Sequence, residues 1–244
     1  YYENAEYVTA REIFKEMLQK YPNADFSKLV AIRLGDFLRD EGKEDEAIQA
    51  YQNAISSYSR EIALVGKLRI ANILAKRPYS DEYLEAIKVY EEIPNLYPET
   101  PQAEEALLRK GLTLTQYGFF TRAIKSLEEF MQIYPQNIYV KKNLIQENID
   151  ENLKGLIDDH FRKGDNFALV SAYNDYKTKY LFNFRFDTTL FQTAAAHRKL
   201  SFYDEALDIL SFLETRSVGT VGELVQMEKA ITLQLSNRLG DARD

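Results

Sequence analysis

Small and large apolar residues recur at a fixed spacing in the first half of the chain, and three of the recurrences end in the same dipeptide. In each of these, an alanine is followed by a large apolar residue four positions later and by the tyrosine of a Tyr-Pro pair eleven positions later. The pairs are Ala10 with Phe14, Ala86 with Tyr90 and Ala123 with Leu127, and the dipeptides are Tyr21-Pro22, Tyr97-Pro98 and Tyr134-Pro135. Positions i and i+4 share one face of an α-helix, and proline cannot continue a helix. The pattern therefore predicts amphipathic helices that end at Tyr-Pro.

The distance between these segments predicts a structural repeat. A fourth copy, which lacks the proline, begins at Ala47, so the steps between successive alanines are 37, 39 and 37 residues. Such a period is typical of helical solenoids, in which each repeat is a pair of helices. The first helix of each pair is expected in VAIRLGDFL, KLRIANILA and LLRKGLTLT. Gly35, Ala71 and Gly111 are then the small residues that let the second helix approach closely.

In these motifs the chain resembles tetratricopeptide (TPR) repeat proteins. Their pattern has a small residue in the first helix, Ala-x3-aromatic in the second and proline near the end, and it matches residues 5–135. The resemblance implies an all-α fold: a right-handed superhelical solenoid of antiparallel helix pairs, with about six repeats and both ends truncated. The family pattern also has a tryptophan in the first helix. This chain has no tryptophan, and that position holds Ala31, Lys67 and Leu107.

A narrower resemblance lies in the 37-residue step and the A-x3-F-x6-YP ending. Both are similar to those of bacterial envelope TPR proteins, such as the lipoprotein of the outer-membrane β-barrel assembly machine and the Tol-Pal-associated periplasmic coordinator. This resemblance implies a periplasmic or outer-membrane-associated setting. A cytoplasmic TPR adaptor is the alternative.

Beyond the regular repeats of residues 1–135, the spacing becomes longer. Residues 136–181 are expected to form an irregular repeat with one extended helix over about 139–163, with a bend near Gly155. The second helix of that repeat is expected to contain Leu169.

Residues 182–244 are expected to hold a further repeat and the start of another, so that 1–244 is a single solenoid. Ala194 and Ala206 stand at the small-residue positions, and Gly240 is expected in a turn. Phe182, Phe184 and Phe186 alternate, as in a strand or a base-stacking platform. At a junction between repeats, a linker that packs into the core is the alternative we favour.

Composition and charge exclude several classes of ligand and of catalytic site. The net charge of −7 argues against a nucleic-acid backbone as ligand. The absence of cysteine excludes disulfides, thiolate catalysis and cysteine metal sites. No apolar run approaches the ~20 residues that span a bilayer, although an anchor outside these residues is left open. No phosphate-binding loop, dinucleotide motif or H-E-x-x-H occurs. We therefore expect neither enzymatic activity nor a cofactor nor a metal site.

The two histidines are one repeat step apart and occupy a packing position. His160 and His197 are separated by 37 residues. In the other repeats, the same position holds Leu38, Leu74 and Leu114. We therefore expect both histidines to pack in the core rather than to bind metal or transfer protons.

A row of arginines is the candidate binding site. Arg33, Arg69 and Arg109 each stand two residues before the small residue of a first helix. The TPR resemblance implies that this position faces a concave groove, where some members hold the C-terminal carboxylate of a ligand. Arginine suits that role because its planar guanidinium pairs bidentately with carboxylates. Alternatively, the arginines pair with acidic residues on neighbouring helices.

The resemblance also implies which other residues face the ligand. Asn72 is expected to hydrogen-bond the ligand backbone, and an apolar floor is expected from Leu29, Ile32, Leu68 and Leu108. The full chaperone-type clamp is absent, because Asp36 and Leu112 stand at other groove positions. The predicted function is a non-enzymatic scaffold that binds a peptide or protein segment in its concave groove, in the assembly or organisation of the bacterial envelope. A regulatory or spacer arm of a larger protein is the alternative.

Overall fold

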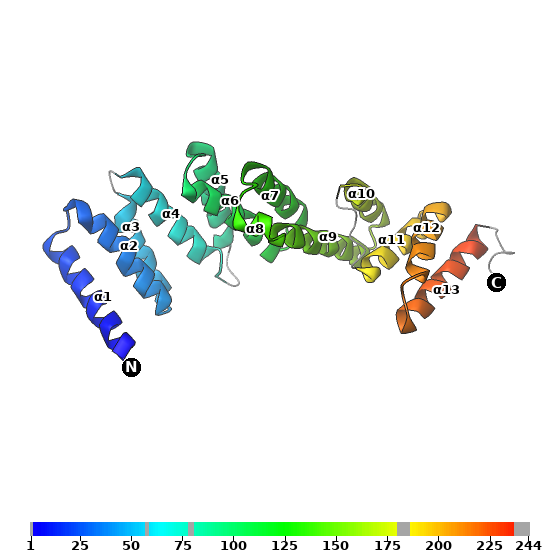
Figure 1. Cartoon of the computed structure of the whole chain (residues 1–244), viewed down its shortest axis with the longest axis horizontal. Helices are drawn as coiled ribbons and strands as arrows, with labels where there is room; N and C mark the ends of the chain where they lie inside the picture. The colour runs from blue at the N-terminus through cyan, green and yellow to red at the C-terminus, as the bar shows by residue number, and fades with distance from the viewer. Residues whose placement is uncertain (1, 57–58, 78–80, 180–185, 237–244) are drawn as a thin grey trace. The chain divides into compact units, whose positions relative to one another are not determined.

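The computed structural model describes residues 2–56, 59–77, 81–179 and 186–236, without the side chains of residues 2–8 and 25. In these residues the regular secondary structure is α-helical throughout. The helices are α1 (Tyr2–Lys20), α2 (Asp25–Asp40), α3 (Glu44–Ile55), α4 (Arg60–Leu74), α5 (Glu82–Leu96), α6 (Pro101–Gln116), α7 (Phe120–Ile133), α8 (Ile138–Lys141), α9 (Leu144–Lys163), α10 (Asn166–Lys177), α11 (Asp187–Lys199), α12 (Tyr203–Glu214) and α13 (Gly219–Leu235). Figure 1 shows them in chain order. The all-α class is as predicted.

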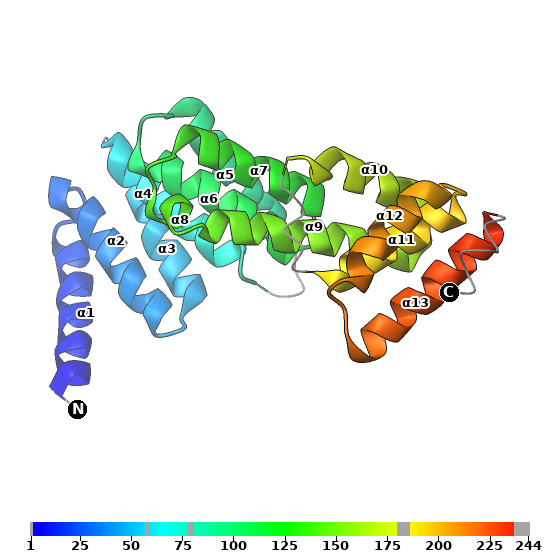
Figure 2. The same cartoon turned by 45° about the vertical axis from the view of Figure 1, so that its right-hand side comes forward.

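The helices form two compact units. One comprises Tyr1–Tyr117 and Lys125–Pro135, and the other comprises Gly118–Ile124 and Gln136–Asp244. In the first unit, consecutive helices from α1 to α6 contact one another, so that α2 pairs with α3 and α4 pairs with α5. This is the predicted array of helix pairs, with α1 in the place of a second helix. In the second unit, Figure 2 shows α9, α10, α11 and α12 side by side, and α13 packs against α12.

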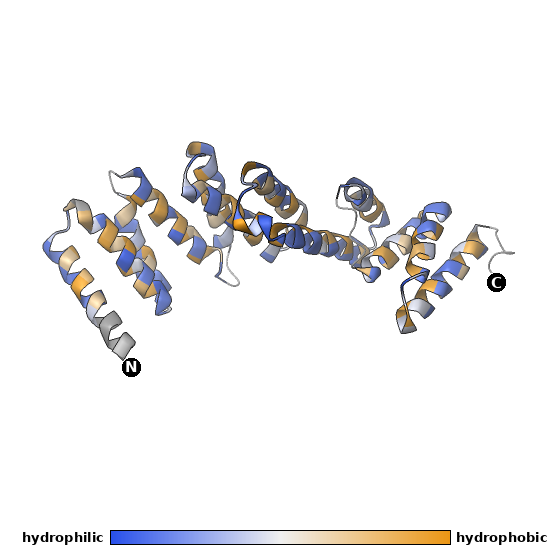
Figure 3. Ribbon diagram, viewed as in Figure 1, coloured by the Kyte–Doolittle hydropathy of each residue, from blue (hydrophilic) through white to orange (hydrophobic). Residues whose placement is uncertain are grey.

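Each first helix lies close to its second helix at the predicted small residue. A Cβ atom added to Gly35 would lie 2.4 Å from the Tyr51 ring of α3, and one added to Gly111 would lie 2.6 Å from Leu127 of α7. Both distances are too short for real atoms. The large side chains Tyr51 and Leu127 are fully buried in the space that the glycines leave. The helices carry apolar and polar residues together, which Figure 3 draws in orange and blue on the same ribbon.

The Tyr-Pro pairs end helices, as predicted. α1 ends at Lys20, α5 at Leu96 and α7 at Ile133, each directly before the tyrosine of a pair. The tyrosines also pack between repeats: the hydroxyl of Tyr134 donates a hydrogen bond to the carbonyl oxygen of Pro98 over 3.3 Å. The guanidinium of Arg60 lies 5.2 Å from the centre of the Tyr97 ring.

The expected helix over 139–163 begins later than predicted. A short helix, α8, ends at Lys141, and α9 begins at Leu144 after Asn143, whose φ of 58° lies in the left-handed region. This conformation cannot continue an α-helix, and asparagine adopts it more readily than most residues. The helix α9 then runs unbroken through Gly155, where an added Cβ would lie 2.5 Å from the Phe120 ring. Gly155 therefore serves close packing.

The predictions for the last repeats have different outcomes. Ala194 and Ala206 are fully buried in α11 and α12, at the predicted small-residue positions. Phe182, Phe184 and Gly240 lie outside the described residues, whereas Phe186 directly precedes α11 with its ring 5.1 Å from Nζ of Lys154. In the described ranges, no helix is both long and apolar enough to cross a membrane.

The close contact at Gly35 predicts that an alanine at this position destabilises the protein. Alanine favours a helix over glycine by about 1 kcal/mol, yet Gly35→Ala is expected to lower the free energy of unfolding by about 1–3 kcal/mol because its methyl group meets the Tyr51 ring. Urea denaturation measures this change. Gln52→Ala, on the exposed face of α3, is the control and should change stability by less than about 0.5 kcal/mol. A more stable Gly35→Ala variant would contradict the packing argument.

Candidate functional site

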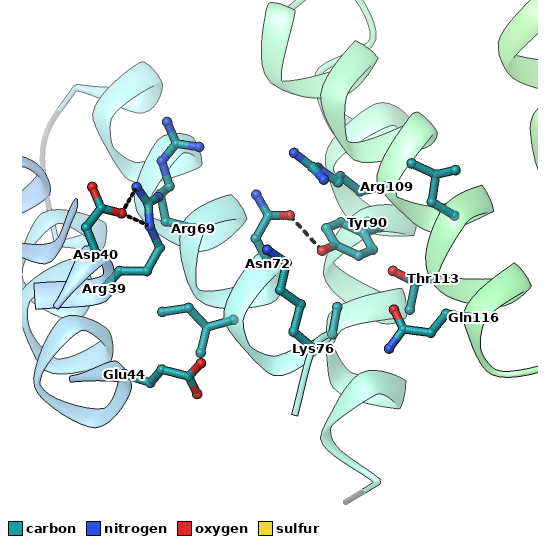
Figure 4. Close-up of a pocket in the computed structure, with 13 residues that line it drawn as sticks. Arg39, Asp40, Glu44, Arg69, Asn72, Lys76, Tyr90, Arg109, Thr113 and Gln116 are labelled. Carbon is teal, nitrogen blue, oxygen red and sulfur yellow. Dashed lines mark hydrogen bonds and ion pairs between the residues drawn. The ribbon is translucent and has the colours of Figure 1, made fainter. Parts of the chain in front are cut away.

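Three successive first helices form one depression in the first unit. Its volume is about 410 Å³, and it is lined by side chains of α2, α4 and α6 together with residues at the start of α3, in α5 and after α4. The lining residues are Arg39, Asp40, Glu44, Arg69, Asn72, Ile73, Ala75, Lys76, Tyr90, Arg109, Leu112, Thr113 and Gln116. Four of them are cationic and two are anionic. In Figure 4, Asn72 lies between Arg69 and Arg109, and the Tyr90 ring lies next to Arg109. We call this depression the first-helix pocket.

The structure brings together three of the predicted binding residues. Arg69, Asn72 and Arg109 line the first-helix pocket, whereas Arg33 is exposed on α2 and does not. Of the expected apolar floor, none lines it. Ile32 and Leu68 are buried, Leu108 is half-buried and Leu29 is exposed. The ligand-binding role of all these residues stays a prediction.

Two of the arginines take part in ion pairs. Nε of Arg69 lies 3.3 Å from Oδ1 of Asp36 on α2, at an angle that does not make a hydrogen bond. Nη1 of Arg69 lies 3.8 Å from Oε1 of Glu105 on α6. Arg109 reaches the same Glu105 oxygen over 3.6 Å within its own helix. Arg69 thus links three consecutive first helices through carboxylates, as the alternative interpretation of the arginine row expects.

In each of two repeats, a buried tyrosine of the second helix donates a hydrogen bond to a polar side chain of the first helix. The hydroxyl of Tyr51 donates to Oδ1 of Asp36 over 2.9 Å, and the hydroxyl of Tyr90 donates to Oδ1 of Asn72 over 2.7 Å. Nδ2 of Asn72 in turn donates to Glu105 over 3.1 Å. Burial raises the pKa of both tyrosines, and the Asp36 carboxylate adds to the rise at Tyr51. Both hydroxyls therefore keep their protons at neutral pH and can donate.

Sequence analysis missed Lys76, Thr113 and Gln116 in the lining. Helical spacing from the arginine row could have identified them. Arg69, Asn72 and Lys76 stand at i, i+3 and i+7 on one helix face, and Thr113 stands at i+4 from Arg109. Arg109, Leu112 and Gln116 repeat this spacing in α6. The same spacing beyond Arg33 gives Asp40, which also lines the pocket.

The predicted packing role of His197 is confirmed. The side chain is buried, with its ring between Tyr173 and Phe202. Nδ1 lies 2.8 Å from the carbonyl oxygen of Thr193, so this nitrogen carries a hydrogen and donates it. His160, one repeat earlier, is half-buried near the end of α9. Within the described ranges, no group of three acidic, histidine or cysteine side chains is placed to hold a metal ion.

Comparisons with known proteins give only low similarities. No protein-family model and no curated protein matches the chain. Among solved structures, it is similar to a tetratricopeptide repeat protein from Parabacteroides merdae, with a TM-score of 0.48 and 16% identity over 98% of this chain and 84% of that one. It is also similar to yeast Tom70, with a TM-score of 0.43 and 14% identity over 97% of this chain and 53% of that one. The chain therefore spans about half the length of the Tom70 chain.

The hydrogen bond between Tyr90 and Asn72 predicts a measurable loss of stability. Tyr90→Phe leaves Oδ1 of Asn72 without its donor, so we expect the free energy of unfolding to fall by about 1 kcal/mol. Urea denaturation at neutral pH measures this fall. Tyr139→Phe, which alters an exposed tyrosine of α8, is the matched control and should leave stability unchanged. Equal effects of the two substitutions would show that the buried hydroxyl contributes nothing.

His197 predicts that stability depends on pH. Burial lowers the pKa of this imidazole, an effect to which Lys177 adds and which the Thr193 carbonyl and Glu205 oppose. In the unfolded chain its pKa is about 6.5. The unfolded state therefore takes up the proton first, and stability falls as pH drops below about 6.5.

The test compares urea denaturation of the wild type and His197→Leu at about pH 7.5 and 5.5. Leucine suits the position because Leu38, Leu74 and Leu114 are buried there in other repeats. The wild type should lose more stability than the variant between these pH values. The same loss in both proteins would contradict the prediction.

Proposed function

We propose that this chain is a non-enzymatic scaffold that binds a peptide or protein segment along the faces of α2, α4 and α6. One observation carries the proposal: Arg69, Asn72 and Arg109, which come from two consecutive repeats, line a single depression of about 410 Å³. Arrays of helix pairs present extended surfaces of this kind to protein partners. The ligand would lie across several first helices rather than within one repeat.

The charges of the pocket favour an acidic ligand. Lys76 makes no ion pair with the residues described here, and the Arg109 side chain is 46% exposed, with only a long contact to Glu105. Both cations are therefore available to carboxylates of a ligand, and Arg109 can bind one bidentately. Arg69 is held by Asp36 and Glu105, so its role is to fix the shape of the pocket.

A smaller depression beside the pocket suits an apolar side chain. It has a volume of about 120 Å³ and shares Arg69 and Glu105 with the first-helix pocket. Its other lining residues are Val65, Leu68, Pro101 and Gln102. The proposed ligand is thus a peptide segment that carries acidic groups next to an apolar residue. In this arrangement Leu68 contributes to the apolar wall of the smaller depression.

We also propose that the scaffold acts in the bacterial cell envelope, in assembly or organisation of envelope machinery. The support is the 37-residue step and the A-x3-F-x6-YP ending described above. Fractionation of cells that express the full-length protein tests this setting. Recovery with the periplasm or the outer membrane is the expected outcome, and recovery with the cytosol would overturn it.

Charge reversal at the two available cations should weaken ligand binding. Lys76→Glu combined with Arg109→Glu places two carboxylates where the proposal puts a ligand carboxylate. Peptides selected from a phage-displayed random library on the wild-type protein should be rich in acidic residues. They should bind the double variant at least about tenfold more weakly, which corresponds to about 1.4 kcal/mol.

A matched control changes the net charge equally and leaves the pocket intact. Lys88→Glu with Lys125→Glu alters two exposed lysines of α5 and α7. This control should bind the selected peptides as the wild type does, and circular dichroism verifies that both variants fold. If both double variants weaken binding equally, long-range charge explains the effect and the pocket is not the binding site.

A further inference from the structure

The donors of three residues that line the first-helix pocket converge on one carboxylate of the protein itself. Nδ2 of Asn72 donates a hydrogen bond to Oε1 of Glu105 over 3.1 Å. The same oxygen lies 3.8 Å from Nη1 of Arg69 and 3.6 Å from Nε of Arg109. Arg69 and Asn72 belong to α4, whereas Glu105 and Arg109 belong to α6. The carboxylate of Glu105 thus lies where cationic and amide donors of two neighbouring first helices meet.

The amide of Asn72 is oriented as a donor toward this place. An asparagine amide has an acceptor oxygen and a donor nitrogen, and its neighbours decide which atom faces which group. The hydroxyl of Tyr90 donates to Oδ1 over 2.7 Å, so the oxygen is occupied and Nδ2 is directed at the carboxylate, as Figure 4 shows for the Tyr90 side of the amide. A group that takes the place of Glu105 must therefore accept a hydrogen bond, as a carboxylate does.

Glu105 is held in this place by weak contacts. Its side chain is 35% exposed, and both guanidinium contacts are longer than the roughly 2.7–2.9 Å of a charge-assisted hydrogen bond. Partly exposed ion pairs of this kind contribute little stability. Arg69, in contrast, also lies 3.3 Å from Oδ1 of Asp36 on α2, which keeps it in position when Glu105 leaves. The donors are thus fixed more firmly than the carboxylate that they hold.

We propose that Glu105 is an internal competitor of the ligand: an acidic side chain of the bound peptide replaces its carboxylate on Arg69, Asn72 and Arg109. This inference rests on the proposed function, because it names the atoms that a ligand carboxylate reaches and the group that it displaces. A ligand with one carboxylate exchanges these contacts for equal ones and gains little. A ligand with several also reaches Lys76, so the competition selects segments with more than one acidic residue.

The test uses the capped peptide acetyl-Glu-Leu-Glu-Glu-Leu-Glu-amide, whose carboxylates are all on side chains. Isothermal titration calorimetry measures its Kd for the whole wild-type protein and for two variants. Glu105→Gln removes the competing charge and should bind the peptide at least about threefold more tightly. Glu105→Asp keeps the charge but shortens the side chain, so that its carboxylate no longer reaches Asn72. It should also bind more tightly than the wild type, by at least about twofold.

A matched control removes the same charge away from the pocket. Glu85→Gln alters an exposed glutamate of α5 and should bind the peptide as the wild type does. Both Glu105 variants lose only partly exposed contacts, so they should fold, and circular dichroism verifies this. Equal tightening by Glu85→Gln and Glu105→Gln would show that net charge alone sets the affinity, and it would overturn the proposal.

The remaining outcomes separate this inference from the proposed function. If the wild type binds the peptide, Lys76→Glu with Arg109→Glu weakens binding, and both Glu105 variants bind as the wild type does, the scaffold function stands and the competition is overturned. Tighter binding by Glu105→Gln alone also overturns it, since Glu105 would then act only by repelling the ligand. If neither the wild type nor any variant binds the peptide up to millimolar concentration, the inference and the proposed acidic ligand both fail.

Discussion

The structure depends on one repeated contact, in which a residue with little or no side chain on a first helix meets a large side chain on the second. Gly35 against Tyr51 and Gly111 against Leu127 are its tightest instances. Glycine within a helix is unfavourable by about 1 kcal/mol relative to alanine. Burying a large side chain contributes more, roughly 1.5–3 kcal/mol. The contact therefore stabilises each pair although its glycine disfavours the helix, and it determines which face of every first helix turns inward.

The polar face of the first unit follows from which face of each first helix is buried. Once the small-residue face of α2, α4 and α6 is buried, the residues on the open face come into line across repeats. Carboxylates and arginines on neighbouring helices then pair, and Tyr51 and Tyr90 bond to the residues directly after Gly35 and Ala71. Such partly exposed ion pairs contribute little stability one by one. Their effect is to hold Arg69 and Asn72 in place, whereas Lys76 makes no ion pair among the described residues.

In two first helices of the second unit, α9 and α13, a larger residue takes the small-residue position. Ile157 and Ile231 stand where the first unit has glycine or alanine. Ile157 still pairs with a second helix, through Leu169 and the neighbouring aromatic rings. Ile231 holds the same register in α13 and is half-buried. The first-helix pocket is a surface that the helix pairs of the first unit create.

The sequence by itself determined the helix pairs, their period and their ends. These features rest on local rules: which residues share a helix face, where a close approach needs glycine or alanine, and where proline stops a helix. The positions of Ala194, Ala206 and His197 followed from the same period. The start of α9 did not, because Asn143 adopts a left-handed conformation that no apolar spacing reveals.

Only the tertiary structure decided which members of the arginine row act together. Arg33, Arg69 and Arg109 hold the same place in the sequence repeat, yet Arg69 and Arg109 line the pocket and Arg33 lies outside it. The surroundings of each arginine come from the neighbouring repeats, and those repeats differ in their side chains. Asp36 and Glu105 hold Arg69, whereas Arg33 has no acidic partner among the described residues. Spacing along the chain fixes the face on which a side chain stands, but charge and packing across repeats fix what it meets.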